Sequence, residues 1–368
     1  MPGQNTAVVP AVPFADAAHE HTEPAFTFQV TPTAATQSFQ FDIPSYGYFR
    51  HLWMQCVASG GVIGPGTLSA DAPFNIIQSI TLLDTNGAPI YGPIDGYSMF
   101  LSNLFGGYAF QQDQRSLPGY STTPASPGFT TRVPVEISHY NGMGSLANQN
   151  AAAPYKLQIV INTIANIYGT APTTPATFTF TGLLEAWSLP NDVDAIGRPQ
   201  EVAPPNHGTV QYWSSRTQSG ITAGNQTVQV QRVGNLLRGV YFVARDGTGA
   251  RSNSVLPSQP ILNWDSRQLY NDSQLYRQND AYESTLSTGY PAGVYAYIFN
   301  NSQLNRSGDD SPSMWIATVQ ATRLELTGTF QGAGSVQVLT NDVAPVEVNP
   351  AERYVETSAT GFHPNPDR

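Results

Sequence analysis

Two stretches of the sequence decide the fold: Phe49-Arg50-His51-Leu52-Trp53-Met54 and Leu237-Arg238-Gly239-Val240-Tyr241-Phe242. Each is a nearly continuous apolar run with an arginine at its second position. Such a run is typical of a strand whose two faces are both buried. Its recurrence indicates that the chain contains one structural unit twice.

Further matches lie on both sides of these runs and keep the same order. They pair Gln37–Phe41 with Gln226–Val230, Pro73–Asp84 with Pro260–Asn271, and the helix candidates Ile94–Leu104 with Ser273–Leu286, which lead into Gly107-Tyr108 and Gly289-Tyr290. The separation between matched residues shrinks slowly along the chain, as small loop deletions would cause. We therefore predict a duplicated domain.

Within each unit the pattern is that of β-strands. Phe39 and Phe41 alternate with Gln40 and Asp42, so one face of this strand is apolar and the other polar. Similar strands are predicted near residues 26–30, 133–137, 155–163 and 177–189. Sheets with one apolar face pack in pairs, which predicts an all-β chain of two tandem β-sandwiches, each with a short inserted helix.

Proline and glycine divide the chain into five segments. Residues 1–25 are rich in Pro and Ala and are predicted to form an N-terminal arm, and residues 26–190 the first β-sandwich. Residues 191–208 hold Gly197, Pro199, Pro204 and Pro205 and are predicted to be a linker. The second β-sandwich is predicted at 209–348, and a C-terminal arm at 349–368.

Charge is sparse in this chain. Only 11% of the residues are charged, and the net charge is −10. Lys156 is the single lysine, so the clustered cations that bind phosphate backbones are missing, and we expect no direct contact with nucleic acid. A surface with so few charges favours a chain that is covered by neighbouring copies.

Candidate catalytic and metal-binding residues are few, and each has a structural explanation. The histidines are His19, His21, His51, His139, His207 and His363. None of them has a zinc-protease spacing, and His51 lies in an apolar run, where a core histidine is expected. The lone Cys56 is also in that run and is interpreted as a buried small hydrophobe.

Two acidic pairs could serve as glycosidase carboxylates or calcium ligands. They are Asp192 with Asp194 and Asp309 with Asp310, and both lie in segments where aspartate favours turns. We interpret them as turn formers, as we interpret His19-Glu20-His21 as part of the arm. The prediction is that the chain has no catalytic, cofactor-binding or metal-binding residue, and needs no cofactor.

Aromatic residues offer one other kind of site. Trp53, Trp187, Trp213 and Trp315 lie in strand patterns, where a core or an interface is favoured over a carbohydrate-stacking platform. Phe14 in the first arm has two open interpretations: an anchor on a neighbour or membrane face, or an incidental residue of a disordered end. The arm has no Lys or Arg, which argues against direct binding to anionic lipid.

The chain resembles the double jelly-roll major capsid proteins of tailless, membrane-containing double-stranded DNA viruses, in the style of tectivirus-like phages. Phe39-x-Phe41-x-Ile43-Pro44 before Tyr48-Phe49-Arg50, Ile76-x-x-x-Ile80-x-Leu82 before Asn86-Gly87, and Leu275-Tyr276-Arg277-Gln278-Asn279-Asp280 are the strings that look like this family. They span about residues 26–348, and the resemblance implies two tandem jelly-roll β-sandwiches, the first jelly roll at 26–190 and the second at 209–348.

The resemblance implies a structural protein of the virion and not an enzyme. It implies homotrimers that tile as pseudo-hexagonal capsomers into an icosahedral shell around an internal membrane, assembled in the host cytoplasm. Implied partners are the chain itself, minor capsid, penton or cement proteins, and the membrane through the terminal arms. Two alternatives stay open at this point: a virion spike or carbohydrate-binding β-sandwich protein, and an all-β glycoside hydrolase.

Overall fold

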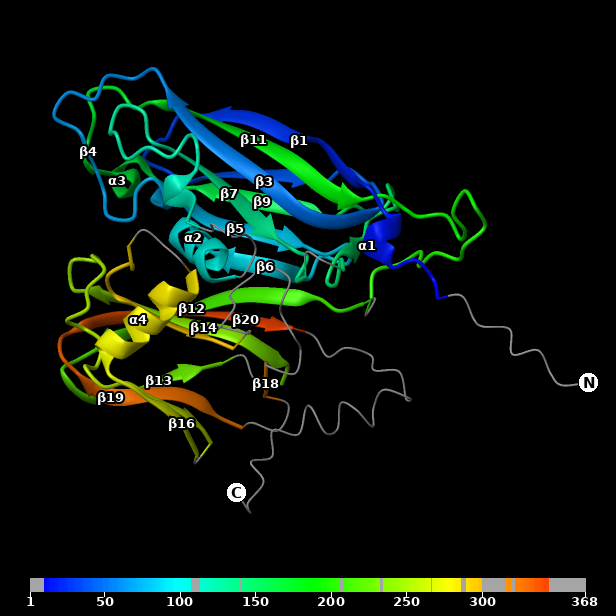
Figure 1. The fold of residues 1–368 in the computed structure, drawn as a ribbon. Coiled ribbons are helices and arrows are strands. Elements are labelled where there is room, and N and C mark those ends of the chain that lie inside the picture. Colours follow the sequence, from blue (N-terminus) through cyan, green and yellow to red (C-terminus); the bar gives the residue numbers. More distant parts are fainter. Residues whose placement is uncertain are drawn as a thin grey trace, which may run out of the picture.

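The fold is taken from a computed structural model, which describes residues 10–106, 113–138, 141–205, 208–231, 234–265, 267–285, 289–299, 315–318 and 322–343, without the side chains of residues 280–285. Two β-sandwiches lie side by side (Figure 1). The first is drawn in blue to green and the second in green to red.

The first sandwich consists of two antiparallel sheets. One has the order β1 (Glu20–Val30), β11 (Thr177–Trp187), β3 (Tyr48–Ser59) and β7 (Gly128–Pro134), with β8 (Leu146–Ala147) paired to β3. The other has the order β2 (Gln37–Asp42), β9 (Lys156–Ile161), β5 (Ile77–Leu83) and β6 (Pro89–Ile94). The connections hold α1 (Phe14–Ala17), β4 (Thr67–Leu68), β10 (Tyr168–Thr170), α3 (Ile164–Ile167) and the 3-10 turns η1 (Phe74–Ile76) and η2 (Gln114–Ser116).

The second sandwich repeats this plan. Its first sheet has the order β12 (Gln211–Ile221), β20 (Gly334–Val343), β14 (Leu236–Asp246) and β17 (Val294–Ile298), with β18 (Ile316–Ala317) paired to β14. Its second sheet has the order β13 (Gly224–Val230), β19 (Leu324–Phe330), β15 (Ile261–Trp264) and β16 (Arg267–Asn271). Reading both sandwiches in chain order gives the same strand arrangement, so the predicted duplication is confirmed.

Both units have a β-bulge at the same place, and this bulge shows which residues of the two units are equivalent. In β3 the ladder with β11 shifts between His51 and Phe49, which leaves Arg50 bulged. In β14 the ladder with β20 shifts between Gly239 and Leu237, which leaves Arg238 bulged. A β-bulge adds one residue to one strand at a defined place, so Arg50 and Arg238 are equivalent, as the first sequence match predicted.

One of the predicted matches is wrong in its alignment. The topology makes β15 the counterpart of β5, and β16 the counterpart of β6, whereas the match of Pro73–Asp84 with Pro260–Asn271 set Leu82 of β5 against Leu269 of β16. The second hairpin is shorter, because β15 has four residues where β5 has seven. Short apolar strands have similar sequences, so the match aligned the later part of β5 with β16 instead of β15 and still paired apolar residues with apolar residues.

Each sandwich has its predicted helix before β7 or β17. α2 (Gly96–Phe105) starts after Asp95, whose carboxylate accepts a hydrogen bond from the Ser98 amide (2.7 Å). α4 (Gln274–Thr285) starts after Ser273, whose Oγ accepts one from the Tyr276 amide (3.1 Å). Both are N-caps of the usual kind, so the two helices can be aligned residue by residue from Asp95 and Ser273.

The two sandwiches share a core. The larger apolar cluster fills the first sandwich and continues onto the outer face of the second, where it includes Trp213, Tyr241 and Leu339. β6 and β12 run parallel and join at Tyr91 and Trp213, so one nine-stranded sheet crosses both units. A smaller cluster lies between the two sheets of the second sandwich.

Two predictions about the N-terminal half need correction. Residues 20–25, predicted to end the arm, belong to β1: their backbone pairs with β11 although they contain almost no apolar residue, so the sequence pattern missed them. In β3 only the first half is buried on both faces. From Trp53 onward its residues alternate, and Val57 is 45% exposed.

Candidate assembly surfaces

Two exposed apolar surfaces lie on the described part of the molecule, one on a sheet of the first sandwich and one on a helix of the second. The first, here called the β3–β11 face, consists of Trp53, Val57 and Leu183 on the outer side of the first sheet. Trp53 lies between Leu183 on β11 and Arg132 on β7 in the ladder. Val57 is 45% exposed and Leu183 is 36% exposed, so this face presents apolar area to solvent.

Polar contacts hold Trp53 flat on this face. The Arg132 guanidinium lies 4.1 Å from the Trp53 ring centroid, and the indole N–H donates to Glu185 Oε1 (2.8 Å). A cation stacked on one side of the ring and a hydrogen bond at its edge restrict the indole to one orientation. The face is therefore a preformed platform.

The second surface, here called the α4 ridge, consists of Leu275 and Tyr276 in the first turn of α4. Leu275 is 68% exposed and Tyr276 is 59% exposed. The next residue, Arg277, points inward, with its guanidinium 4.8 Å from the Tyr297 ring. The ridge is thus anchored from below while its apolar side chains face solvent.

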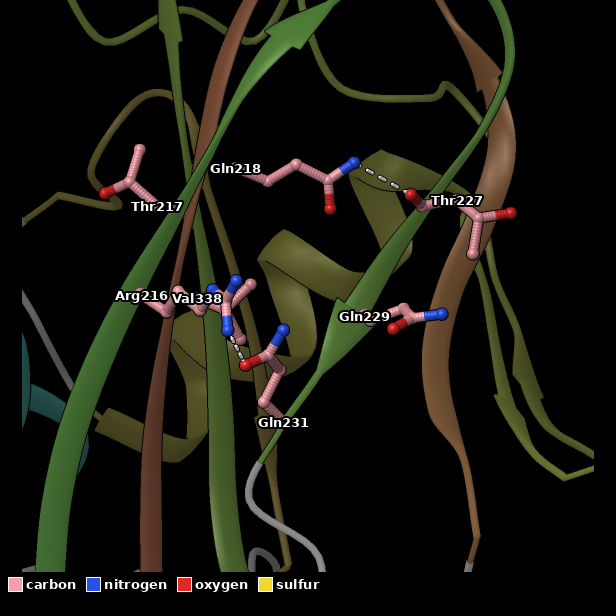
Figure 2. A pocket seen from close by; sticks show the side chains of 7 residues that line it. All are labelled: Arg216, Thr217, Gln218, Thr227, Gln229, Gln231 and Val338. Carbon is pink, nitrogen blue, oxygen red and sulfur yellow. Dashed lines mark hydrogen bonds between the residues drawn. The ribbon is translucent and has the colours of Figure 1, made fainter.

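A polar groove lies between the edges of β12 and β13. Figure 2 shows its lining residues, Arg216, Thr217, Gln218, Thr227, Gln229, Gln231 and Val338, which enclose about 350 Å³. Arg216 donates to Gln231, and Gln218 Nε2 donates to the Thr227 carbonyl (3.0 Å). These bonds bridge the two sheet edges. The lining has no carboxylate, imidazole or thiol, so the hydroxyls of Thr217 and Thr227 have no general base beside them in the groove.

A buried polar cluster surrounds Glu136. Its carboxylate accepts from Arg50 Nε (3.1 Å), Trp187 Nε1 (2.6 Å) and Ser145 Oγ (3.2 Å), and His51 Nε2 lies 3.4 Å away. Burial lowers the pKa of His51 to about 3 and outweighs the opposing effect of Glu136, so the imidazole is neutral. The predicted assignment of His51 to the core is confirmed by its complete burial.

Arg50 connects this cluster to the surface. It also donates to Glu20 Oε1 (2.8 Å), and its guanidinium lies 3.9 Å from the Trp187 ring. His21, which follows Glu20 in the sequence, stacks on Tyr46 with a centroid distance of 3.8 Å. The His19-Glu20-His21 run therefore leads into β1, which begins at Glu20 and belongs to the first sandwich.

The other candidate residues have structural surroundings. The Asp194 carboxylate accepts from the Ile196 and Arg198 amides (both 2.9 Å), and these bonds, with the Arg198 side chain, lower its pKa, so it forms a turn as predicted. Asp309, Asp310, His139, His207 and His363 lie outside the described residues. In the described part of the chain, no three His, Cys, Asp or Glu side chains gather as metal ligands would.

Cys56 and the aromatic residues lie mostly in the interior. Cys56 is fully buried, which raises the pKa of its thiol. Trp187, Trp213 and Trp315 are buried, whereas Trp53 is only partly covered. Neither interpretation of Phe14 holds: it is 1% exposed and packs edge-on against Tyr48 (5.3 Å) of its own sandwich. An aromatic residue with a preformed pocket nearby is buried even within an irregular terminal segment.

Of the residues on these two surfaces, sequence reasoning named Trp53 as a core or interface residue, quoted Leu275 and Tyr276 only as part of a family-like string, and did not name Val57 or Leu183. The repeat sets Trp53 against Tyr241, but only the structure shows that the first is partly covered and the second buried. Among the described helices, none combines the length and apolar character needed to cross a bilayer.

Comparison with known proteins places the fold. No family model and no curated protein matches the chain. The STIV MCP crystal structure is 14% identical, covers 89% of this chain and 98% of its own, and has a TM-score of 0.62. PBCV-1 VP54, fitted into a reconstruction of the virophage Sputnik, is 11% identical over 89% and 93%, with a TM-score of 0.61. Major capsid protein P2 of bacteriophage PM2 is 8% identical over 89% and 97%, with a TM-score of 0.54.

These structures cover nearly the whole chain, and at such low identity the likeness concerns the fold. The chain therefore has the double jelly-roll fold, as the sequence resemblance predicted.

Proposed function

We propose that this chain is a major capsid protein, a structural subunit of an icosahedral virus shell and not an enzyme. The observation that supports this most strongly is the duplicated sandwich itself, two jelly rolls fused side by side through β6 and β12 and a shared core. The double jelly-roll structures it matches carry capsid protein names or come from virus particles.

The subunit of this shell is a homotrimer. Three chains of two equivalent sandwiches supply six similar units, which tile a surface as a pseudo-hexagonal capsomer. The β3–β11 face and the α4 ridge leave apolar area for such contacts. An obligate interface of this kind buries roughly 2,000 Å² or more.

The described ends of the chain lie near each other at one end of the molecule. Val12 pairs with Gln200 of the linker, and Val343 at the end of β20 pairs with Gln211, whose side chain donates to the Val135 and Glu136 carbonyls (both 2.9 Å). In Figure 1, β20 points toward the end where α1 lies. We propose that the segment before β1, residues 1–19, and the C-terminal arm, residues 349–368, act at this end, toward an internal membrane and minor capsid proteins.

The native mass of the purified protein tests the function. Light scattering should give three times 39.7 kDa, and electron microscopy of the same fraction should show pseudo-hexagonal particles or shell fragments. A protein that stays monomeric at every concentration and salt condition would refute the capsid proposal. Lipid analysis of purified virions tests the membrane separately, since lipid-free particles would exclude it while leaving the capsid role intact.

A further inference from the structure

The starting observation is how α2 contacts the second sandwich. Ser98 in its first turn accepts a hydrogen bond from Gln337 Nε2 (3.1 Å) on the outer face of β20. Beside it, the Tyr97 ring lies 4.3 Å from the Arg251 guanidinium. At the other end of the helix, Phe105 stacks on Tyr241 of β14 with a centroid distance of 5.4 Å. These contacts, together with the packing of α2 on its own sandwich, where Phe100 stacks on Phe74 and Asn103 Nδ2 donates to the Arg132 carbonyl, leave every residue of α2 buried.

The parts of this contact have equivalents in the other copy of the repeat, and in the described residues these equivalents carry exposed side chains. The N-caps Asp95 and Ser273 align the helices, so Leu275 and Tyr276 stand where Tyr97 and Ser98 stand in α2. Tyr97 is 4% exposed, whereas Leu275 is 68% exposed. The helix that covers the second sandwich is buried, and its copy presents an apolar ridge to solvent.

The receiving sheets are equivalent as well. From the shared bulge, Trp53 corresponds to Tyr241, because each pairs with a leucine of the next strand, Leu183 and Leu339 respectively. Two residues before Leu183 on β11, Thr181 pairs with Gln55 of β3. Two residues before Leu339 on β20, Gln337 pairs with Val243 of β14. Thr181 is therefore the equivalent of Gln337. Leu339 is fully buried under the first sandwich, whereas Leu183 is 36% exposed.

We propose that the α4 ridge of one copy of this chain docks on the β3–β11 face of the next copy, and that this contact repeats between chains the contact of α2 within a chain. The inference rests on the proposed capsid function and specifies its partner: a second copy of the same chain. In this contact Tyr276 lies beside Thr181 of the next copy, as Ser98 lies beside Gln337.

Two features favour a second copy over an unrelated partner. The occupant of the equivalent face is known, because α2 covers it within the chain, and α4 is the other copy of that helix. The two surfaces also match in character, since each combines exposed aliphatic side chains with an aromatic ring: Leu275 with Tyr276, and Val57 and Leu183 with Trp53. Because ridge and face are different surfaces, the contact is head-to-tail and can close a ring of three.

Disulfide trapping tests the contact directly. In the full chain carrying Thr181→Cys and Tyr276→Cys, mild oxidation should convert most of the protein into a covalent trimer on a denaturing, non-reducing gel. The native Cys56 is buried and contributes little background. The matched control pairs Thr181→Cys with Ile196→Cys, a residue 77% exposed on the linker turn outside both surfaces, and should remain monomeric on the gel.

Charge substitution gives an independent readout. The double variant Leu275→Asp, Tyr276→Asp should shift the trimer to a folded monomer by light scattering, with an unchanged circular dichroism spectrum, whereas Ile196→Asp should remain trimeric. If the wild type is trimeric but does not cross-link at these cysteines, and the aspartate variant also stays trimeric, the contact is overturned and the capsid proposal stands. If the wild type never associates, both fail.

Discussion

Arg50 is the residue on which the Glu136 cluster depends. Its guanidinium neutralises a fully buried carboxylate and reaches Glu20 at the surface. Arg50→Ala leaves the Glu136 charge without its main partner, and we expect a loss of about 3–5 kcal/mol in the free energy of unfolding. Urea unfolding at fixed protein concentration measures it. Arg198→Ala, which breaks a surface ion pair with Asp194, is the control and should cost far less. Equal losses would contradict the role of Arg50.

His51 makes folding sensitive to acid. Its pKa is lowered from 6.5 to about 3 by burial, so between these values the unfolded chain binds a proton that the folded chain does not. This contribution to stability is intact above pH 6.5 and is lost as the pH falls toward 3, at up to about 1.4 kcal/mol per pH unit. Between pH 7 and pH 4, the free energy of unfolding should fall less with decreasing pH for His51→Gln than for the wild type. A His51→Gln profile parallel to that of the wild type would exclude the effect.

The N-caps of α2 and α4 occupy equivalent positions but make different contacts. Asp95 caps α2 and also accepts from Gln337 of the second sandwich, whereas Ser273 caps α4 alone. Either change to Ala should cost about 1 kcal/mol through the lost cap. Asp95→Ala should cost about 1 kcal/mol more, because a buried hydrogen bond between the sandwiches is also lost. Denaturant midpoints of the two variants compare them, and equal costs would show that Gln337 contributes nothing.

Periodicity in the sequence predicted most strands and both helices because their burial follows simple rules. Phe39 and Phe41 face the first core while Gln40 is exposed, and residues 96–105 form the predicted helix. Arg50 and Arg238 could be matched because a bulge keeps a polar residue inside an apolar run.

Other features depend on contacts between distant residues. The first residues of β1 are held by backbone pairing with β11, which leaves no apolar pattern. Phe14 is buried because Tyr48 and Trp187 happen to lie beside it in space. The exposure of Leu275 and Leu183 could not be predicted from composition, because the equivalent Tyr97 and Leu339 are just as apolar and are buried.

At the scale of the whole molecule, the shared core couples the two sandwiches. Asp71 of the first sandwich pairs with Arg245 and Arg251 of the second, which adds an ionic clamp beside the apolar contact. Trp213, Tyr241 and Leu339 are buried only because the first sandwich covers them. The halves should therefore unfold together, although a linker joins them.

Cutting the linker separates covalent connection from packing. Inserting a protease site between Asp194 and Arg198, in an exposed turn, and cleaving it should leave the halves associated on gel filtration and melting in one calorimetric transition. The second half expressed alone, residues 209–348, should be insoluble or bind hydrophobic dyes, because it exposes the outer face that α2 covers. Two separate transitions after cleavage, or a soluble and well-folded second half, would show that each jelly roll is independently stable and that the shared core is only a contact between finished domains.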